Sequence, residues 1–124
     1  MPKVRLDIVI RNEDKKESYQ TDGILKDNTL SFFDQKQQKH NLELNDQRID
    51  YQRKGDPGFD FIFEPGTHHQ GKYYIGSNHM LFDIQTHTLR HDKNKINIVY
   101  TLKQEYDIVG HSEILITYDV LKEG

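Results

Sequence analysis

The sequence contains seven histidines, the side chains best suited to bind a metal or carry a proton near neutral pH. His87 and His91 lie four residues apart, but in a stretch that alternates like a β-strand this spacing separates them by roughly 13 Å, too far to share one ion. His68 and His69 follow Pro65-Gly66, and we expect both in a solvated loop. We therefore predict no metal site and no cofactor.

Nucleophilic catalysis has equally little support from the spacing of its residue types. His111, Ser112 and Glu113 are adjacent, and neighbours on a strand point to opposite faces of the sheet. No serine lies in a Gly-x-Ser-x-Gly elbow, and the sequence has no cysteine. We therefore expect a protein that is not an enzyme. A catalytic site at the mouth of the fold is the weakest of the alternatives.

A sharper chemical signal comes from polar side chains on faces that are otherwise apolar. Arg53 lies on such a face. A buried arginine is costly unless a carboxylate or an anionic ligand pairs with it, so an inward Arg53 indicates an anion-binding residue. The alternative for Arg53 is a position at a strand end, where its stem packs on the rim and its head reaches water. The tyrosines can equally be core residues with a satisfied hydroxyl. These candidate ligand-binding residues are Tyr51, Arg53, Thr86, Tyr100 and Tyr118.

All of these residues must be positioned by β-strands, because apolar and polar side chains alternate with a period of two along nearly the whole chain. Turn residues such as Lys26-Asp27-Asn28 separate the alternating stretches. The longest stretch is expected to keep one phase from Met80 through to Thr88, and segment 106–112 is expected to turn between the last two strands. The predicted strands are residues 4–10, 19–25, 29–34, 40–44, 47–54, 59–63, 73–75, 79–89, 96–102 and 114–120.

The short connections between these strands predict antiparallel hairpins, because a parallel pair needs a crossover of a dozen or more residues. About ten strands in an open sheet would leave two exposed edges, and closure removes both. We therefore predict an all-β fold, an antiparallel up-and-down closed barrel of about 8 to 10 strands. Residues 1–124 are expected to form one domain, with a sandwich of two sheets as the alternative fold.

The composition narrows the partners and the compartment. The net charge is −3 and the two signs are interleaved, so no basic footprint for nucleic acid is present. No stretch approaches the length of apolar sequence that crosses a bilayer, and the first ten residues hold no apolar signal core. Together with the absence of cysteine, these features predict a cytoplasmic protein that binds neither nucleic acid nor membrane.

Several short stretches, taken in order, resemble one known family. They are Arg53-Lys54-Gly55, Phe61 with Phe63, Tyr73-Tyr74-Ile75-Gly76, Ile84-Gln85-Thr86, Ile98-Val99-Tyr100-Thr101-Leu102 and the strand after Gly110. Over nearly the whole chain, the sequence resembles the YwiB-like family of small, uncharacterised bacterial β-barrels of the calycin type. The resemblance implies a closed barrel related in shape to lipocalins and fatty-acid-binding proteins, and it carries no catalytic residue across. Ile75 stands where the family pattern suggests threonine.

Two functions follow from these observations. The first is non-catalytic binding of a small, partly apolar, amphipathic ligand, with or without an anionic group, in the barrel lumen. The second is a homodimeric interaction module whose lumen is filled by side chains and whose outer surface meets a partner. The apolar residues expected on that outer surface are Val9, Ile62, Leu81, Val99 and Leu115.

Overall fold

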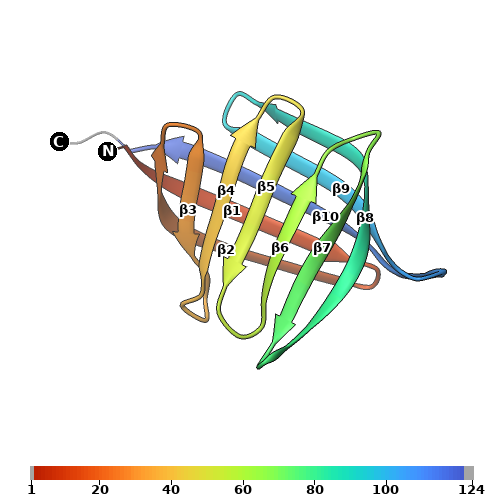
Figure 1. Ribbon diagram of the computed structural model, residues 1–124. Helices are drawn as coiled ribbons and strands as arrows, with labels where there is room; N and C mark the ends of the chain where they lie inside the picture. Colours follow the sequence, from red (N-terminus) through yellow and green to blue (C-terminus); the bar gives the residue numbers. More distant parts are fainter. Residues whose placement is uncertain (1, 122–124) are drawn as a thin grey trace.

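The alternating stretches form the walls of a closed antiparallel barrel, as the sequence predicts (Figure 1). The computed structural model describes residues 2–121. Within them, consecutive strands are hydrogen-bonded neighbours, and β1 pairs with β10 to close the barrel. The ten strands are β1 (Lys3–Asn12), β2 (Lys15–Lys26), β3 (Thr29–Phe33), β4 (Lys39–Asn45), β5 (Arg48–Lys54), β6 (Gly58–Phe63), β7 (His68–Ile75), β8 (Asn78–Asp92), β9 (Lys95–Gln104) and β10 (Asp107–Val120).

Three strands begin well before the residue that the sequence predicts, and the first of them is β2, which begins at Lys15 and not at Tyr19. His68 and His69 belong to β7, not to a loop, because they pair with β8 across from Gln85 and Ile84. Segment 106–112 is mostly strand, since β10 begins at Asp107. Alternation did not predict these extensions, because the added segments are polar or mixed in composition. Their backbone hydrogen bonds form regardless of side-chain polarity.

Apolar side chains fill the interior of the barrel. Val4, Leu6 and Ile8 of β1 are at most 1% exposed, and inward-facing residues of the other strands pack with them into one cluster. Aromatic rings continue this packing along the barrel: Phe59 stacks on Phe61 with ring centroids 4.6 Å apart, and Phe63 contacts Tyr100 at 4.7 Å. Burial of this apolar surface is the main source of stability in a chain without disulfides.

Gly71 lets β7 approach the aromatic core closely. A Cβ atom at this buried position would lie 2.4 Å from Cδ1 of Phe61 and 2.6 Å from Cδ1 of Ile84. No other residue fits there without displacing a ring or a branched side chain. The glycine is therefore a packing requirement of the barrel interior.

A bulge in β8 changes which residues face inward. Phe82, Ile84 and Thr86 are buried, as the expected phase requires. The register with β9 then shifts between Thr86 and Thr88, and Leu89 packs against the core. The expectation of one phase through to Thr88 is therefore wrong beyond Thr86, because an extra residue in one strand reverses the faces that follow.

The two ends of the barrel differ. The start of β1 and the end of β10 pair at one end, where Val4 lies opposite Val120. The turns that follow β1, β3, β5, β7 and β9 lie at the other end, which we call the distal end. Figure 1 shows β3 to β7 in the front wall, with β1, β2, β9 and β10 crossing behind them.

Candidate functional site

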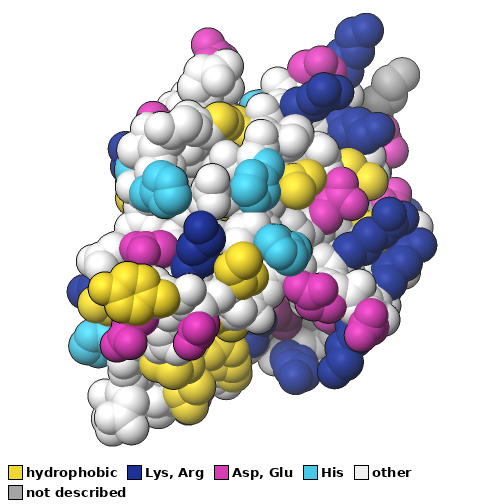
Figure 2. All heavy atoms as spheres, turned by 90° about the vertical axis from the view of Figure 1, so that its right-hand side faces the viewer, with side chains coloured by type: hydrophobic (Ala, Val, Ile, Leu, Met, Phe, Trp, Pro, Cys, Tyr) yellow, Lys and Arg dark blue, Asp and Glu magenta, His cyan; other side chains and the backbone are white. Residues whose placement is uncertain are grey.

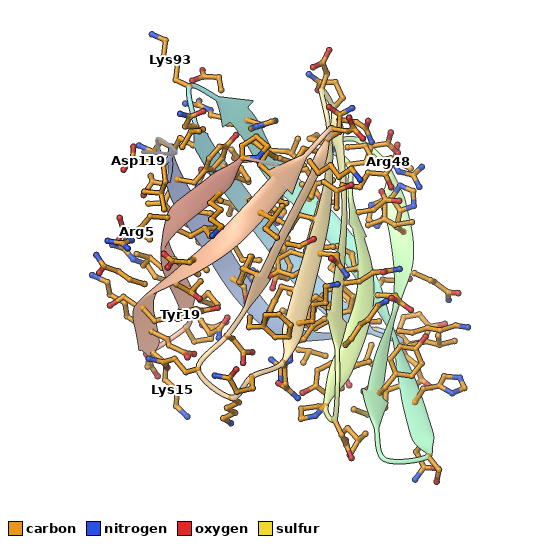
Figure 3. The ribbon with its side chains drawn as sticks, turned by 90° about the vertical axis from the view of Figure 1, so that its left-hand side faces the viewer. Arg5, Lys15, Tyr19, Arg48, Lys93 and Asp119 are labelled. Carbon is orange, nitrogen blue, oxygen red and sulfur yellow. The ribbon has the colours of Figure 1, made fainter. Side chains whose placement is uncertain are left out.

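The barrel wall opens near its distal end, between β2 and β3. β2 pairs with β1 from Lys15 to Ile24, but it pairs with β3 only from Gly23 to Lys26. The two strands therefore diverge from their shared hairpin, as Figure 3 shows with Tyr19 on the diverging half of β2. We call this gap, between residues 15–22 of β2 and residues 33–38, the β2–β3 opening.

A cavity of about 120 Å³ lies at the β2–β3 opening. This volume equals that of about four water molecules in the liquid, enough for a carboxylate or phosphate group. The site therefore offers both charges and several hydrogen-bonding groups within a small space. The lining residues are Ile10, Glu17, Tyr19, Asp34, Gln35, Lys36, His40 and Arg53.

Three hydrogen-bonded side chains lie on the inner side of the cavity: Asp34 and His40 line it, and Tyr51 is buried behind His40. His40 is buried, with Nε2 2.8 Å from Oδ2 of Asp34 and Nδ1 2.8 Å from the hydroxyl of Tyr51. The imidazole also stacks on Phe32, with ring centroids 4.7 Å apart. The backbone N–H groups of Lys36 and Gln38 donate to the second oxygen of Asp34.

The protonation states of these side chains follow from burial and hydrogen bonding. Burial lowers the pKa of His40, and the hydrogen bond and charge of Asp34 only partly oppose that effect. Burial acts to raise the pKa of Asp34, but the hydrogen bonds from His40, Gln38 and Lys36 outweigh it, so this pKa lies below its ordinary value. Near neutral pH, a neutral His40 thus donates a hydrogen bond from Nε2 to the Asp34 carboxylate and accepts one at Nδ1 from the Tyr51 hydroxyl.

The two tyrosines beside His40 are poor nucleophiles. Burial raises the pKa of Tyr19, and the charges of Asp34 and Glu17 add to this rise. Burial also holds the pKa of Tyr51 well above its ordinary value. Both hydroxyls therefore stay protonated and act as hydrogen-bonding groups.

Arg53 supplies a half-buried positive charge to the cavity. It lies opposite His40 on β4 and Phe59 on β6, and its Nε donates to the carbonyl oxygen of Pro57 at 3.1 Å. Among the described residues, no carboxylate lies within 4.0 Å of its guanidinium nitrogens. The two terminal nitrogens can therefore bind an anion from outside the protein.

The structure brings two of the five predicted site residues to this cavity and distributes the others. Arg53 lines the cavity, and Tyr51, two residues away on the same face of β5, lies behind it and is hydrogen-bonded to His40. Thr86 and Tyr100 are cross-strand partners inside the barrel, where the Thr86 hydroxyl accepts the backbone N–H of Glu64 at 3.2 Å. Tyr118 lies further along β10, with its hydroxyl 3.3 Å from Nε2 of His91. The inward orientation of the set is correct, but its members do not share one site.

Sequence reasoning missed the residues that complete the site. His40 alternates in phase with Leu42 and Leu44, so its inward orientation was visible in the sequence. Tyr19 likewise alternates in phase with Thr21 and Leu25, whereas Asp34 carried no comparable signal. Tyr19 and Asp34 line the same cavity because β2 diverges from β3, and no local sequence pattern predicts that divergence.

Most histidines lie away from this cavity. All except His40 are in β7, β8 or β10, and Figure 2 shows histidine side chains on that side of the barrel. The Thr101 hydroxyl joins two of them across three strands, 2.7 Å from Nε2 of His87 and 2.8 Å from Nδ1 of His111. Within the described part of the chain, no three potential ligands among His, Asp and Glu are grouped to hold a metal ion.

The outer apolar residues are also distributed unevenly. Val9 of β1 lies directly opposite Leu115 of β10, and Val99 of β9 lies opposite the neighbouring Glu113. Ile62 and Leu81 sit elsewhere, on β6 and β8.

Residues 2–121 form no helix long and apolar enough to cross a membrane.

Comparison with known proteins places the chain in a family. It is similar to the ywiB protein from Bacillus subtilis, whose crystal structure matches with a TM-score of 0.62 and 15% sequence identity, over 98% of this chain and 92% of that chain. This likeness concerns the fold, and it confirms the YwiB-like resemblance. No curated protein matches the sequence. The family model described as "Domain of unknown function (DUF1934)" matches residues 4–116, and the chain therefore belongs to the DUF1934 family.

Proposed function

We propose that this protein is a non-catalytic binding protein that holds an anionic group at the β2–β3 opening. The observation that carries the proposal is Arg53, a half-buried guanidinium that lines a cavity and has no carboxylate partner among the described residues. Partial burial of an unpaired cation costs free energy, and an anionic ligand offsets that cost.

The packing of the interior favours this opening over the lumen as the ligand site. The core cluster runs through the barrel, so an amphipathic ligand would have to displace buried side chains to enter it. At the opening, the ligand's anionic group lies against Arg53 and its apolar part against Ile10 and the Tyr19 ring.

The acidic residues of the cavity disfavour a ligand group with two or more negative charges. The charge of Asp34 is already engaged by His40 and by two backbone N–H groups, whereas Glu17 stands exposed on the rim. Lys36 and Arg53 together balance these two carboxylates. The four charges sum to zero, so a group with one negative charge, such as a carboxylate, is repelled less by Asp34 and Glu17 than a group with two negative charges.

The experiment is a titration of the ¹⁵N-labelled protein with sodium acetate and with inorganic phosphate, followed by amide chemical shifts. Acetate is expected to shift the amide signals of residues at the opening, including Tyr19 and His40. Arg53→Gln should weaken acetate binding about tenfold or more, because a hydrogen bond to a charged group contributes about 1.5–3 kcal/mol.

Lys54→Gln is the matched control for this variant. Lys54 follows Arg53 on β5, is exposed, and its change removes the same charge without touching the cavity. Equal binding by the wild-type protein and by Arg53→Gln would refute the proposal, as would shifts distributed evenly over the surface.

A second candidate function is self-association through the outer face of β1, β9 and β10. The support is the direct pairing of Val9 with Leu115 and the adjacent position of Val99. Sedimentation velocity is the measurement: a dimer that Leu115→Lys dissociates favours this function, and a monomer at all concentrations excludes it.

We further propose a cytoplasmic location, which the absence of cysteine supports.

A further inference from the structure

We propose that the anionic group held by Arg53 is the side-chain carboxylate of another polypeptide, which binds as an added strand along the free edge of β2. This inference rests on the proposed function and names the partner of the same site. Two observations carry it: an unpaired stretch of strand backbone, and an unpaired cation directly beside it.

The free edge follows from the pairing pattern of β2. The backbone N–H of Leu25 donates to the carbonyl of Pro2, so Leu25 directs its backbone groups toward β1. Because these directions alternate along an antiparallel strand, Lys16, Ser18 and Gln20 direct theirs away from β1. β2 has no pairing partner on that side before Gly23 within the described residues.

The surroundings leave this edge accessible. The Gln20 side chain leans back to β1, with Nε2 2.6 Å from Oδ1 of Asp7. In the neighbouring turn, the N–H of Asp34 donates to the carbonyl of Gln38, so the turn closes on itself and does not pair with β2. The side chain of Thr21 donates to the carbonyl of Phe33 at 2.8 Å and marks the point where the opening narrows.

An added strand fits this space in a defined way. Between Lys16 and Asp22 the edge is roughly 20 Å long, enough for a segment of about six residues. Alternate side chains of that segment would point inward, into the cavity beside Tyr19 and toward Arg53. Inward aspartate or glutamate would meet the guanidinium.

The charges at the rim favour an acidic segment over a basic one. Lys15, Lys16 and Lys36 border the opening, and Glu17 is the one acidic residue of the cavity lining whose carboxylate has no hydrogen-bond or ion-pair partner among the described residues. Lysines on an exposed strand edge can also serve only to prevent aggregation. In that case the edge would bind no peptide in the test below.

The test uses a hexapeptide of alternating valine and glutamate, acetylated and amidated so that it has no terminal charges. On binding to the full-length protein, it should protect the amides of Ser18 and Gln20 from hydrogen exchange. The amides of Tyr19 and Thr21, which face β1, should already be protected in the free protein. The same peptide with glutamine in place of glutamate should bind about tenfold more weakly.

Ser18→Pro tests the edge itself. Proline removes the outward N–H and blocks an added strand, but it leaves the pairing of β2 with β1 intact because that N–H does not face β1. This variant should lose peptide binding and keep acetate binding. Ser18→Ala retains the N–H and should bind both.

The outcomes separate the two proposals. Acetate binding with no peptide binding, or peptide binding that Ser18→Pro leaves unchanged, refutes the added strand and leaves the anion site standing. If neither acetate nor peptide responds to Arg53→Gln, the proposed function itself is refuted. Peptide contacts that map away from β2 also overturn the inference.

Discussion

The hydroxyl of Tyr51 is expected to stabilise the folded protein through its hydrogen bond to His40 beside the cavity. Asp34 fixes the proton of His40 on Nε2, so Nδ1 must accept a hydrogen bond from Tyr51. Tyr51→Phe keeps the aromatic ring, which is 2% exposed, and removes only that donor. The imidazole cannot turn to compensate, because a turned ring would lose its bond to Asp34.

The magnitude follows from the cost of a buried acceptor without a donor. That cost is about 1–3 kcal/mol. With a urea m-value of about 1.5 kcal/mol/M, the midpoint of unfolding should fall by about 0.7–2 M. Because the sequence has no tryptophan, far-UV circular dichroism is the appropriate signal for these curves.

Tyr118→Phe is the matched control. Its hydroxyl lies 3.3 Å from His91, a longer contact than the 2.8 Å between Tyr51 and His40. We expect this variant to lose about 0.5 kcal/mol or less. If the two variants lose equal stability, or if Tyr51→Phe loses almost none, the assigned tautomer and its hydrogen bond are wrong.

Two further predictions concern the pH dependence of stability and the packing of the barrel. The pKa of His40 in the folded protein lies below its ordinary 6.5. As pH falls below 6.5, His40 therefore becomes protonated in the unfolded chain but stays neutral in the folded one. Stability should therefore fall by at most about 1.4 kcal/mol per pH unit from this group, and His40→Phe should show a shallower slope between pH 6.5 and 5. Asp34 adds a loss only below its ordinary 3.8, because its folded pKa is lower still; parallel slopes for wild type and variant would contradict this account. Gly71→Ala should lose about 1–3 kcal/mol by crowding Phe61, whereas Gly110→Ala, with no atom within 4 Å of the added Cβ, should change stability by about 0.5 kcal/mol or less in thermal unfolding; equal effects would contradict the packing argument.

The period of two determined most of the fold from the sequence alone. A strand with one buried face must alternate, and short turns force antiparallel neighbours, so Val4, Leu6 and Ile8 had to point inward together. Closure followed from the cost of exposed edges. The inward orientation of Tyr51 and Arg53 came from the same periodicity.

The local exceptions required the tertiary structure. The β8 bulge after Thr86 reverses a phase that the sequence continues, because register is set by pairing with β9 and not by residues within β8. The strand character of His68 and His69 likewise depends on pairing with β8.

The site itself was decided by tertiary structure. Periodicity can say that His40 and Arg53 face inward, but not that β2 leaves β3 at Gly23 and brings Tyr19 and Asp34 to the same cavity. Alternation encodes the face of each strand, a local property, whereas distances between side chains of different strands depend on register, twist and the point at which pairing ends. The sequence therefore determined which residues line the barrel, and only the folded chain decided which of them meet.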